Sequence, residues 1–177
     1  KVALFKAGEI AQVATPLELY TNPIDMETAD FMGSPRINLI DGEGFYDGST
    51  LEVESPLGKF SFGKESLKLA EKMPEGKKFG VVLGVRPEVI QIATRKPEGD
   101  GYIEAVVYAS QPAGSETIVT LDTQGTQILA LQVDLRNYEM NQKVWISMAS
   151  RRINVFNKET QRLIRYAEEN IKEETDE

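Results

Sequence analysis

Apolar and polar residues alternate with a period of two over much of the chain after residue 38, and this pattern predicts a protein built mainly of β-strands. One predicted hairpin joins residues 51–54 to residues 59–62, with an apolar face formed by Leu51, Val53, Phe60 and Phe62. Its connection has Pro56 in the second position and Gly58 in the fourth, which favours a type I turn. Further strands are predicted at residues 102–109, 118–121, 128–131, 144–148, 153–156 and 162–164. Short strands and turns at this spacing are typical of a barrel or a sandwich.

Residues 79–85 form a continuous apolar run, which predicts a strand buried on both faces. The run ends at Arg86, and residues 89–93 are expected to continue as an extended edge. Residues 66–73 carry Leu67, Leu69 and Ala70 in a short helical pattern that residues 74–76 end. Residues 96–101 contain proline and two glycines, so they predict a break between two β-structured parts.

The first 34 residues have a different pattern, which predicts a short arm with a hairpin and two helices. Residues 2–5 and 10–13 flank a turn at residues 6–9. Thr15 is a suitable N-cap and Pro16 suits the first helical position, so a helix should begin there and end at Asn22. A second short helix is predicted over residues 25–32, and Gly33 should end it.

Composition narrows the functional classes. The 177 residues carry a formal net charge of −8 and contain neither cysteine nor histidine. A nucleic-acid partner is disfavoured because phosphate binding needs clustered basic side chains. Disulfides, thiol catalysis and zinc–thiolate sites are ruled out, and the commonest general base and metal ligand is missing. No apolar run approaches the ~20 residues of a membrane span, and no signal peptide is visible.

Catalytic residues are not assigned, and neither is a cofactor or a metal site. The sequence lacks a G-x-x-x-x-G-K-[ST] phosphate loop, and its carboxylates are scattered over predicted turns and polar strand faces. The chain is therefore not expected to be an enzyme in its own right. Residues 167–177 form an acidic tail, expected to be a fraying helix end or disordered.

Several sequence words occur in an order that resembles one protein family. Near the start these words are GEIAQV (8–13), TPLELY (15–20), Asn22-Pro23, ADFMGSP (29–35) and Asn38. Later words are LGVRPE (83–88), GSET (114–117) and VFNKETQRLI (155–164). Together they resemble the exit from the nucleotide-binding domain of a sugar-type ABC importer ATPase into its C-terminal regulatory domain. In the last word Asn157 and Gln161 stand where the family usually has Asp and Gly, which puts the turn type in question.

The resemblance implies two small β-barrel or sandwich subdomains of oligonucleotide-binding-like type, preceded by an αβ arm. Residues 1–34 would be the residual end of the nucleotide-binding domain, residues 35–96 the first β subdomain and residues 97–166 the second. Because the catalytic parts of the ATPase are absent from the chain, the arm is expected to be poorly anchored, with apolar faces free to pair with another copy.

The family resemblance also implies a role without catalysis. In sugar importers this region holds two copies of the ATP-binding subunit together, and in the maltose branch it receives a cytosolic regulatory protein. The parent subunit would hydrolyse Mg-ATP at the cytoplasmic, inner face of the cell membrane and meet the permease through its catalytic domain. The sequence does not name the sugar, since other chains select it.

Five residues are candidates for interface or regulatory contacts. Arg86 and Glu88 flank Pro87 at the end of the buried strand, and they would form either a subunit contact or a local ion pair. Ser115 and Glu116 follow Gly114 in a turn that is either a recognition site or a plain polar hairpin tip. Trp145 should face away from Val144 and Ile146, as an interface anchor or beneath a second covering layer.

The alternative function is a small-oxyanion sensor. Related domains of molybdate systems carry an S-A-R-N-x-L-x-G pattern that binds oxyanions through backbone N–H groups, serine and lysine. The corresponding string here runs from Ser34 to Gly42, but Ile37 breaks its spacing and Asp41 adds a negative charge. The resemblance to this pattern is therefore only partial.

Overall fold

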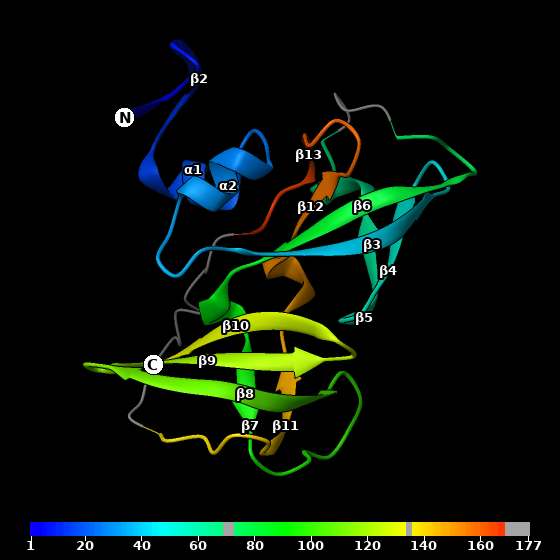
Figure 1. Ribbon diagram of the computed structural model, residues 1–177. Coiled ribbons are helices and arrows are strands. Elements are labelled where there is room, and N and C mark those ends of the chain that lie inside the picture. Colours follow the sequence, from blue (N-terminus) through cyan, green and yellow to red (C-terminus); the bar gives the residue numbers. More distant parts are fainter. Residues whose placement is uncertain (69–72, 134–135, 169–177) are drawn as a thin grey trace, which may run out of the picture.

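Two curled antiparallel β-sheets form most of the computed structural model, which describes residues 1–68, 73–133 and 136–168 (Figure 1). The six-stranded sheet has the order β13-β12-β6-β3-β4-β5. Its strands are β3 (Asn38–Tyr46), β4 (Thr50–Ser55), β5 (Gly58–Gly63), β6 (Lys78–Val85), β12 (Asn154–Asn157) and β13 (Leu163–Arg165). The mainly β fold predicted from the alternating pattern is confirmed.

The five-stranded sheet has the order β10-β9-β8-β11-β7. Its strands are β7 (Gln91–Ala93), β8 (Ile103–Ala113), β9 (Glu116–Thr123), β10 (Thr126–Gln132) and β11 (Lys143–Ser147). The two sheets do not coincide with the two expected subdomains, residues 35–96 and 97–166. β7 lies with the later strands, and β12 and β13 return to the sheet of the earlier ones.

The buried faces of both sheets contribute to one cluster of apolar side chains. Leu51, Val53 and Phe62 of the first sheet belong to it together with Val107 and Ile146 of the second. The predicted inward face of the β4–β5 hairpin is thereby confirmed, with Phe60 packed partly buried against the cluster. In β6 every residue from 81 to 85 is buried, as the continuous apolar run predicts.

A short helix predicted at residues 66–73 is wrong where the structure describes this segment. Lys64–Ser66 is a single 3₁₀ turn (η1), and Leu67 pairs with Arg165 in an isolated bridge. The backbone N–H of Lys68 donates to the carbonyl of Ile164 at 2.8 Å. Pairing with the end of β13 therefore uses the backbone groups that a helix would need. Residues 69–72 lie outside the described residues, as do residues 169–177 of the predicted tail. Its first two residues, Ala167 and Glu168, are ordered by backbone hydrogen bonds to Thr21 and Arg151, so the expected disorder is wrong for them.

The arm contains the predicted hairpin and both predicted helices. The hairpin pairs β1 (Val2–Lys6) with β2 (Glu9–Ala14), and the helices are α1 (Pro16–Thr21) and α2 (Met26–Phe31). Thr15 caps α1 in a reciprocal capping box with Glu18, which confirms the predicted start. Asp25 caps α2 by accepting the backbone N–H of Thr28 at 2.8 Å.

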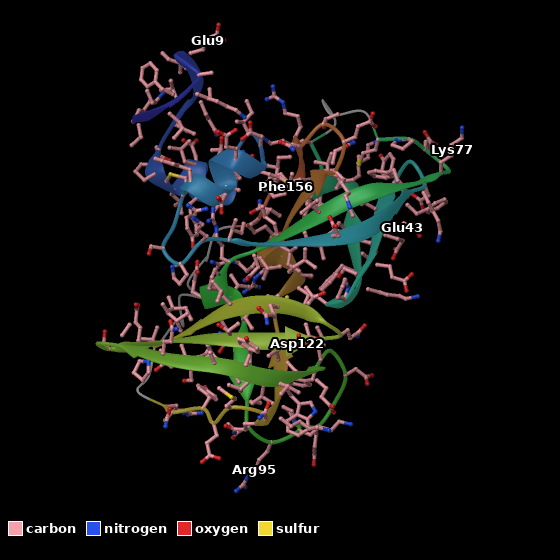
Figure 2. The ribbon with its side chains drawn as sticks, in the orientation of Figure 1. Glu9, Glu43, Lys77, Arg95, Asp122 and Phe156 are labelled. Atoms are coloured by element: carbon pink, nitrogen blue, oxygen red, sulfur yellow. The ribbon has the colours of Figure 1, made fainter. Side chains whose placement is uncertain are left out.

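The expectation of a poorly anchored arm is wrong for its helices. Leu19 and Ala29 are completely buried, and Ala29 packs with Val82, Phe156 and Leu163. Figure 2 shows Phe156 between the arm helices and the six-stranded sheet, with Glu9 at the far tip of the hairpin. The sheet itself supplies the apolar partners that the helices need. The hairpin exposes large apolar side chains on both strands, such as Phe5 and Ile10, and the helices expose Leu17 and Phe31 on their outer sides.

Gln161 adopts a left-handed backbone conformation, with φ of 60°, in the turn between β12 and β13. This is the position where glycine is usual in the resembling family. Side-chain-bearing residues in this region cost about 1 kcal/mol that glycine avoids. We expect Gln161→Gly to raise the free energy of unfolding by about 0.5–1 kcal/mol, measured by denaturant titration.

The matched control is Glu159→Gly in the same turn. Glu159 has no positive φ, so the added backbone freedom should lower the stability there instead. Equal losses in both variants would show that Gln161 is not strained.

Candidate functional site

Arg86 directly follows β6, and its side chain is 3% exposed. Its Nη1 donates to the carbonyl oxygens of Ala29, at 2.9 Å, and of Met32. Its Nη2 donates to the carbonyl oxygen of Tyr20 at 3.1 Å. These carbonyls lie in the last turn of α1 and at the end of α2, where helices leave unpaired acceptors and a partial negative charge. One guanidinium therefore caps the carboxyl ends of both arm helices.

The ring of Tyr20 covers the guanidinium of Arg86, with Cζ 4.0 Å from the ring centroid. Burial lowers the pKa of Arg86 to about 10, against an opposing effect of the nearby Asp30 carboxylate. The group therefore stays charged at neutral pH. Its Nε has no hydrogen-bond partner, so the three carbonyls and the aromatic face carry the compensation for burying this charge.

Glu88 lies in the 3₁₀ turn η2 (Pro87–Val89) and accepts a hydrogen bond from the Tyr20 hydroxyl. Burial raises the pKa of the Glu88 carboxyl, while its own backbone N–H and the charge of Arg152 act in the opposite direction. Tyr20 thus brings the two sequence candidates together, since Arg86 meets its ring face and Glu88 its hydroxyl. Sequence reasoning missed Tyr20 as a contact residue, although it belongs to the quoted TPLELY word.

A second buried arginine, Arg165 of β13, was not singled out from the sequence. Its Nη1 donates to the carbonyl oxygens of Ser150 and Arg151, both at 3.1 Å, and of Ile153. Its guanidinium also lies over the ring of Phe62, 4.7 Å from the centroid. Burial lowers the pKa of Arg165, with the Glu168 carboxylate opposing this effect. Arg165 fixes the segment before β12 much as Arg86 fixes the arm.

Asn38 joins the two sheets through its side-chain amide. Its Nδ2 donates to the carbonyl oxygens of Val85, at 3.0 Å, and Leu129, at 2.8 Å. Its Oδ1 accepts the backbone N–H of Leu129 at 2.7 Å. The amide therefore pairs with both backbone groups of a residue in β10, the edge strand of the other sheet. Asn38 was part of the family resemblance, but its bridging role has no signal in the sequence.

Ser115 and Glu116 lie at the tip of the β8–β9 hairpin. Gly114 and Ser115 form a two-residue turn in which Gly114 has φ of 70°, and Ala113 pairs with Glu116. Ser115 is exposed and Glu116 is half-buried. The turn is therefore accessible, and its role in recognition stays a prediction.

Trp145 is half-buried in β11, while its neighbours Val144 and Ile146 are completely buried on the other side of the strand. It lies directly opposite Glu104 of β8 and Ala93 of β7. Exposed apolar side chains accompany it along β8, including Tyr108, which is 59% exposed at a bulge. We call the set of Tyr102, Val106, Tyr108 and Trp145 the outer aromatic face.

The string considered for oxyanion binding offers no unpaired cation in this geometry. Arg36 is exposed and pairs with Asp30 at 3.2 Å. Lys158 pairs with Asp41 of the string at 2.9 Å. An anion would have to compete with a carboxylate for each of these cations.

No group of three or more Asp or Glu side chains in the part of the chain that the structure describes is placed to hold a metal ion. Within the same residues, every helix is too short or too polar to cross a membrane.

The chain is similar to known proteins over most of its length. Residues 83–156 match the TOBE domain family. The chain is 30% identical over 164 residues to "Xylose/arabinose import ATP-binding protein XacK" of Haloferax volcanii, covering 90% of this chain and 40% of that protein. It is 31% identical over 164 residues to "Multiple sugar-binding transport ATP-binding protein MsmK" of Streptococcus mutans, covering 89% and 41%.

Residues 83–156 of this chain therefore resemble a TOBE domain. The chain spans about two fifths of the length of these curated relatives. A solved structure of the cytoplasmic molybdate-binding protein ModG has the same fold, with a TM-score of 0.51 and 16% identity over 67% of this chain and 94% of that one. The oligonucleotide-binding-like character of the fold is thereby confirmed.

The burial of Glu88 in the TOBE region predicts a pH-dependent effect of Glu88→Gln. The folded pKa of Glu88 lies above its unfolded value, so the ionised carboxylate lowers stability at and above the folded pKa. Glutamine keeps an acceptor for the Tyr20 hydroxyl without the charge. We expect Glu88→Gln to raise the melting temperature at pH 7, with a gain that shrinks as pH falls toward the ordinary glutamate pKa of about 4.3.

The control for this prediction is Glu98→Gln, at an exposed position between β7 and β8. Melting curves of both variants and the wild type over the same pH series give the comparison. A loss of stability in Glu88→Gln at pH 7 would mean that the carboxylate charge is needed beside Tyr20 and Arg86.

Proposed function

We propose that this chain is the non-catalytic regulatory and dimerisation region of the ATP-binding subunit of an ABC importer, most simply one for carbohydrate. The observation that carries the proposal is similarity over about nine tenths of the chain to the import ATP-binding proteins XacK and MsmK. The names of these two proteins refer to xylose, arabinose and multiple sugars. A partial match to "sn-glycerol-3-phosphate import ATP-binding protein UgpC" of Pectobacterium atrosepticum, 34% identical over 56% of this chain, leaves the transported compound open.

The chain corresponds to about two fifths of each of these ATP-binding proteins. Under the proposal, Mg-ATP is bound and hydrolysed by another part of the subunit, which also contacts the permease. The assembled subunit would lie at the cytoplasmic, inner face of the membrane. The accessible β8–β9 tip, with Ser115 and Glu116, is the candidate contact for a cytosolic regulatory protein.

The candidate contact for a second copy is the outer aromatic face. Tyrosine and tryptophan are the residue types enriched at protein interfaces, since each buries a large area at a low cost in side-chain entropy. Beside Trp145, Lys143 pairs with Glu104 at 2.9 Å, so the charges at this face balance locally. Two copies of a chain with net charge −8 can approach there with less repulsion than over the molecule as a whole.

Sedimentation velocity of the wild-type chain over a concentration series tests this proposal. We expect a reversible dimer, weakened about ten-fold or more by Trp145→Ser and by Tyr108→Ser, because both remove aromatic area from the contact. The matched control is Phe31→Ser, which removes a highly exposed aromatic ring from α2, outside the outer aromatic face. Far-ultraviolet circular dichroism checks that each variant is folded.

Two outcomes would contradict the proposal. A wild-type chain that stays monomeric at every concentration would exclude self-association through this region. A dimer that responds to Phe31→Ser but to neither outer-face variant would move the contact to the arm. Thermal melts with molybdate, sulfate and Mg-ATP test the alternative, because a ligand that binds only the folded form must raise its stability.

A further inference from the structure

The two parts of the arm are attached to the rest of the chain in different ways. Helices α1 and α2 are held by buried groups, whereas the β1–β2 hairpin is held by few contacts at its base. From this contrast we infer that α1 and α2 are structural parts of the two-sheet body, here called the β module. We also infer that the chain's joint, the point where the hairpin can change direction relative to the helices, lies between Ala14 and Thr15. Arg86 is the residue that positions both helices on the module. Residue patterns alone suggested a division after Ser34 instead.

The helices meet the β module along a continuous polar seam. Besides the three carbonyls capped by Arg86, Asn154 of β12 donates its Nδ2 to the carbonyl of Thr21 at 2.9 Å. The backbone N–H of Ala167 donates to the same carbonyl at 3.1 Å. Leu163 donates to the carbonyl of Ile24 at 3.2 Å, and Met26 to that of Gln161 at 3.1 Å. Breaking this seam would leave buried backbone groups without partners.

The end of α2 is fitted closely around the guanidinium of Arg86. Gly33 has φ of 121°, and a Cβ placed there would lie 3.1 Å from the Nη1 atom of Arg86. Glycine therefore allows the chain to leave α2 while passing directly over the buried charge. Gly33, which the sequence division places at the start of a linker, therefore lies directly against Arg86.

The hairpin has a weaker attachment. The Gln12 amide donates to the carbonyl of Asn22 at 3.1 Å and accepts the N–H of Ile24 at 2.9 Å. Lys6 pairs with Asp25 and Glu27, but its side chain is 43% exposed, and such surface pairs contribute little. A two-stranded sheet is only marginally stable by itself. These contacts can open without disturbing the buried seam beneath the helices.

Helix α1 also begins without help from the hairpin. Its first turn is capped by its own residues: Glu18 N–H donates to the Thr15 hydroxyl at 3.2 Å, and Thr15 N–H donates to the Glu18 carboxylate at 2.8 Å. Thr15 itself has an extended backbone, with φ of −69° and ψ of 156°. A change of direction just before Thr15 therefore costs the helix none of its cap. In a longer subunit, displacements of the hairpin would be taken up here, while α1 and α2 moved with the β strands.

Amide hydrogen exchange of the whole chain, read by NMR or mass spectrometry, tests the inference. We expect the amides of Leu19, Asn22, Ala29 and Met32 to exchange at rates near those of β6, and the β1–β2 amides to exchange about a hundred-fold faster. Arg86→Met should bring the helix amides toward the hairpin rates while β8 and β9 keep their protection. Arg36→Met is the matched control, because Arg36 is an exposed arginine paired with α2 through Asp30.

Two insertions test the position of the joint even if Arg86→Met fails to fold. Gly-Gly-Ser between Ala14 and Thr15 should leave helix protection and melting temperature almost unchanged. The same insertion between Gly33 and Ser34 should reduce the protection of α2 and lower the melting temperature. The inference is overturned if the two insertions have equal effects, if the 14/15 insertion exposes the helices, or if the hairpin and helices exchange together in the wild type. None of these outcomes depends on self-association.

Discussion

The structure depends on the need to satisfy one buried positive charge. Arg86 directly follows the completely buried end of β6, and a guanidinium there is costly unless acceptors surround it. The ends of α1 and α2 supply carbonyl oxygens that have no partners within their own helices. The carbonyl oxygens therefore offset the cost of burying the guanidinium, and the guanidinium supplies the hydrogen bonds that the helix ends lack. The helices can end inside the protein because Arg86 is there, and Arg86 can be buried because the helices end there.

Hydrogen bonds from buried polar side chains to backbone groups also fix how the two sheets are placed relative to each other. Apolar packing between curled sheets allows small sliding motions, because it has no direction. Asn38 adds direction, since its amide matches both backbone groups of Leu129 at an otherwise unpaired strand edge. Arg165 similarly ties the segment before β12 to β13. β12 returns to the six-stranded sheet after a long stretch of chain in the other sheet. Hydrogen bonds of this kind hold such a strand in its position.

The local parts of this fold could be predicted from the sequence, and the long-range parts could not. The β4–β5 hairpin, the Thr15 cap and the buried run in β6 each follow from neighbouring residues alone. The helix predicted at residues 66–73 was wrong because Leu67 and Lys68 pair with a strand almost a hundred residues later. In the same way, the sequence showed Arg86 and Glu88 as a charged pair, but not that Tyr20, more than sixty residues earlier, stands between them. A pattern of spacing within a segment cannot reveal partners whose positions are set by the packing of other segments.

The residues that hold the fold together and the residues available for external contacts are different sets in this protein. Groups that fix internal geometry, including Arg86, Arg165 and Asn38, are buried and bonded mainly to backbone atoms, so they constrain shape without limiting which partner can bind. The residues left for external contacts, such as Trp145 and Tyr108, lie on strands of the five-stranded sheet, on the side of β8 and β11 away from the core. Contacts made there can change without disturbing the seam that holds the helices, because the two share no residue. A change at Arg86 should instead alter the placement of the arm and leave the outer aromatic face intact, so the two roles are separable by mutation.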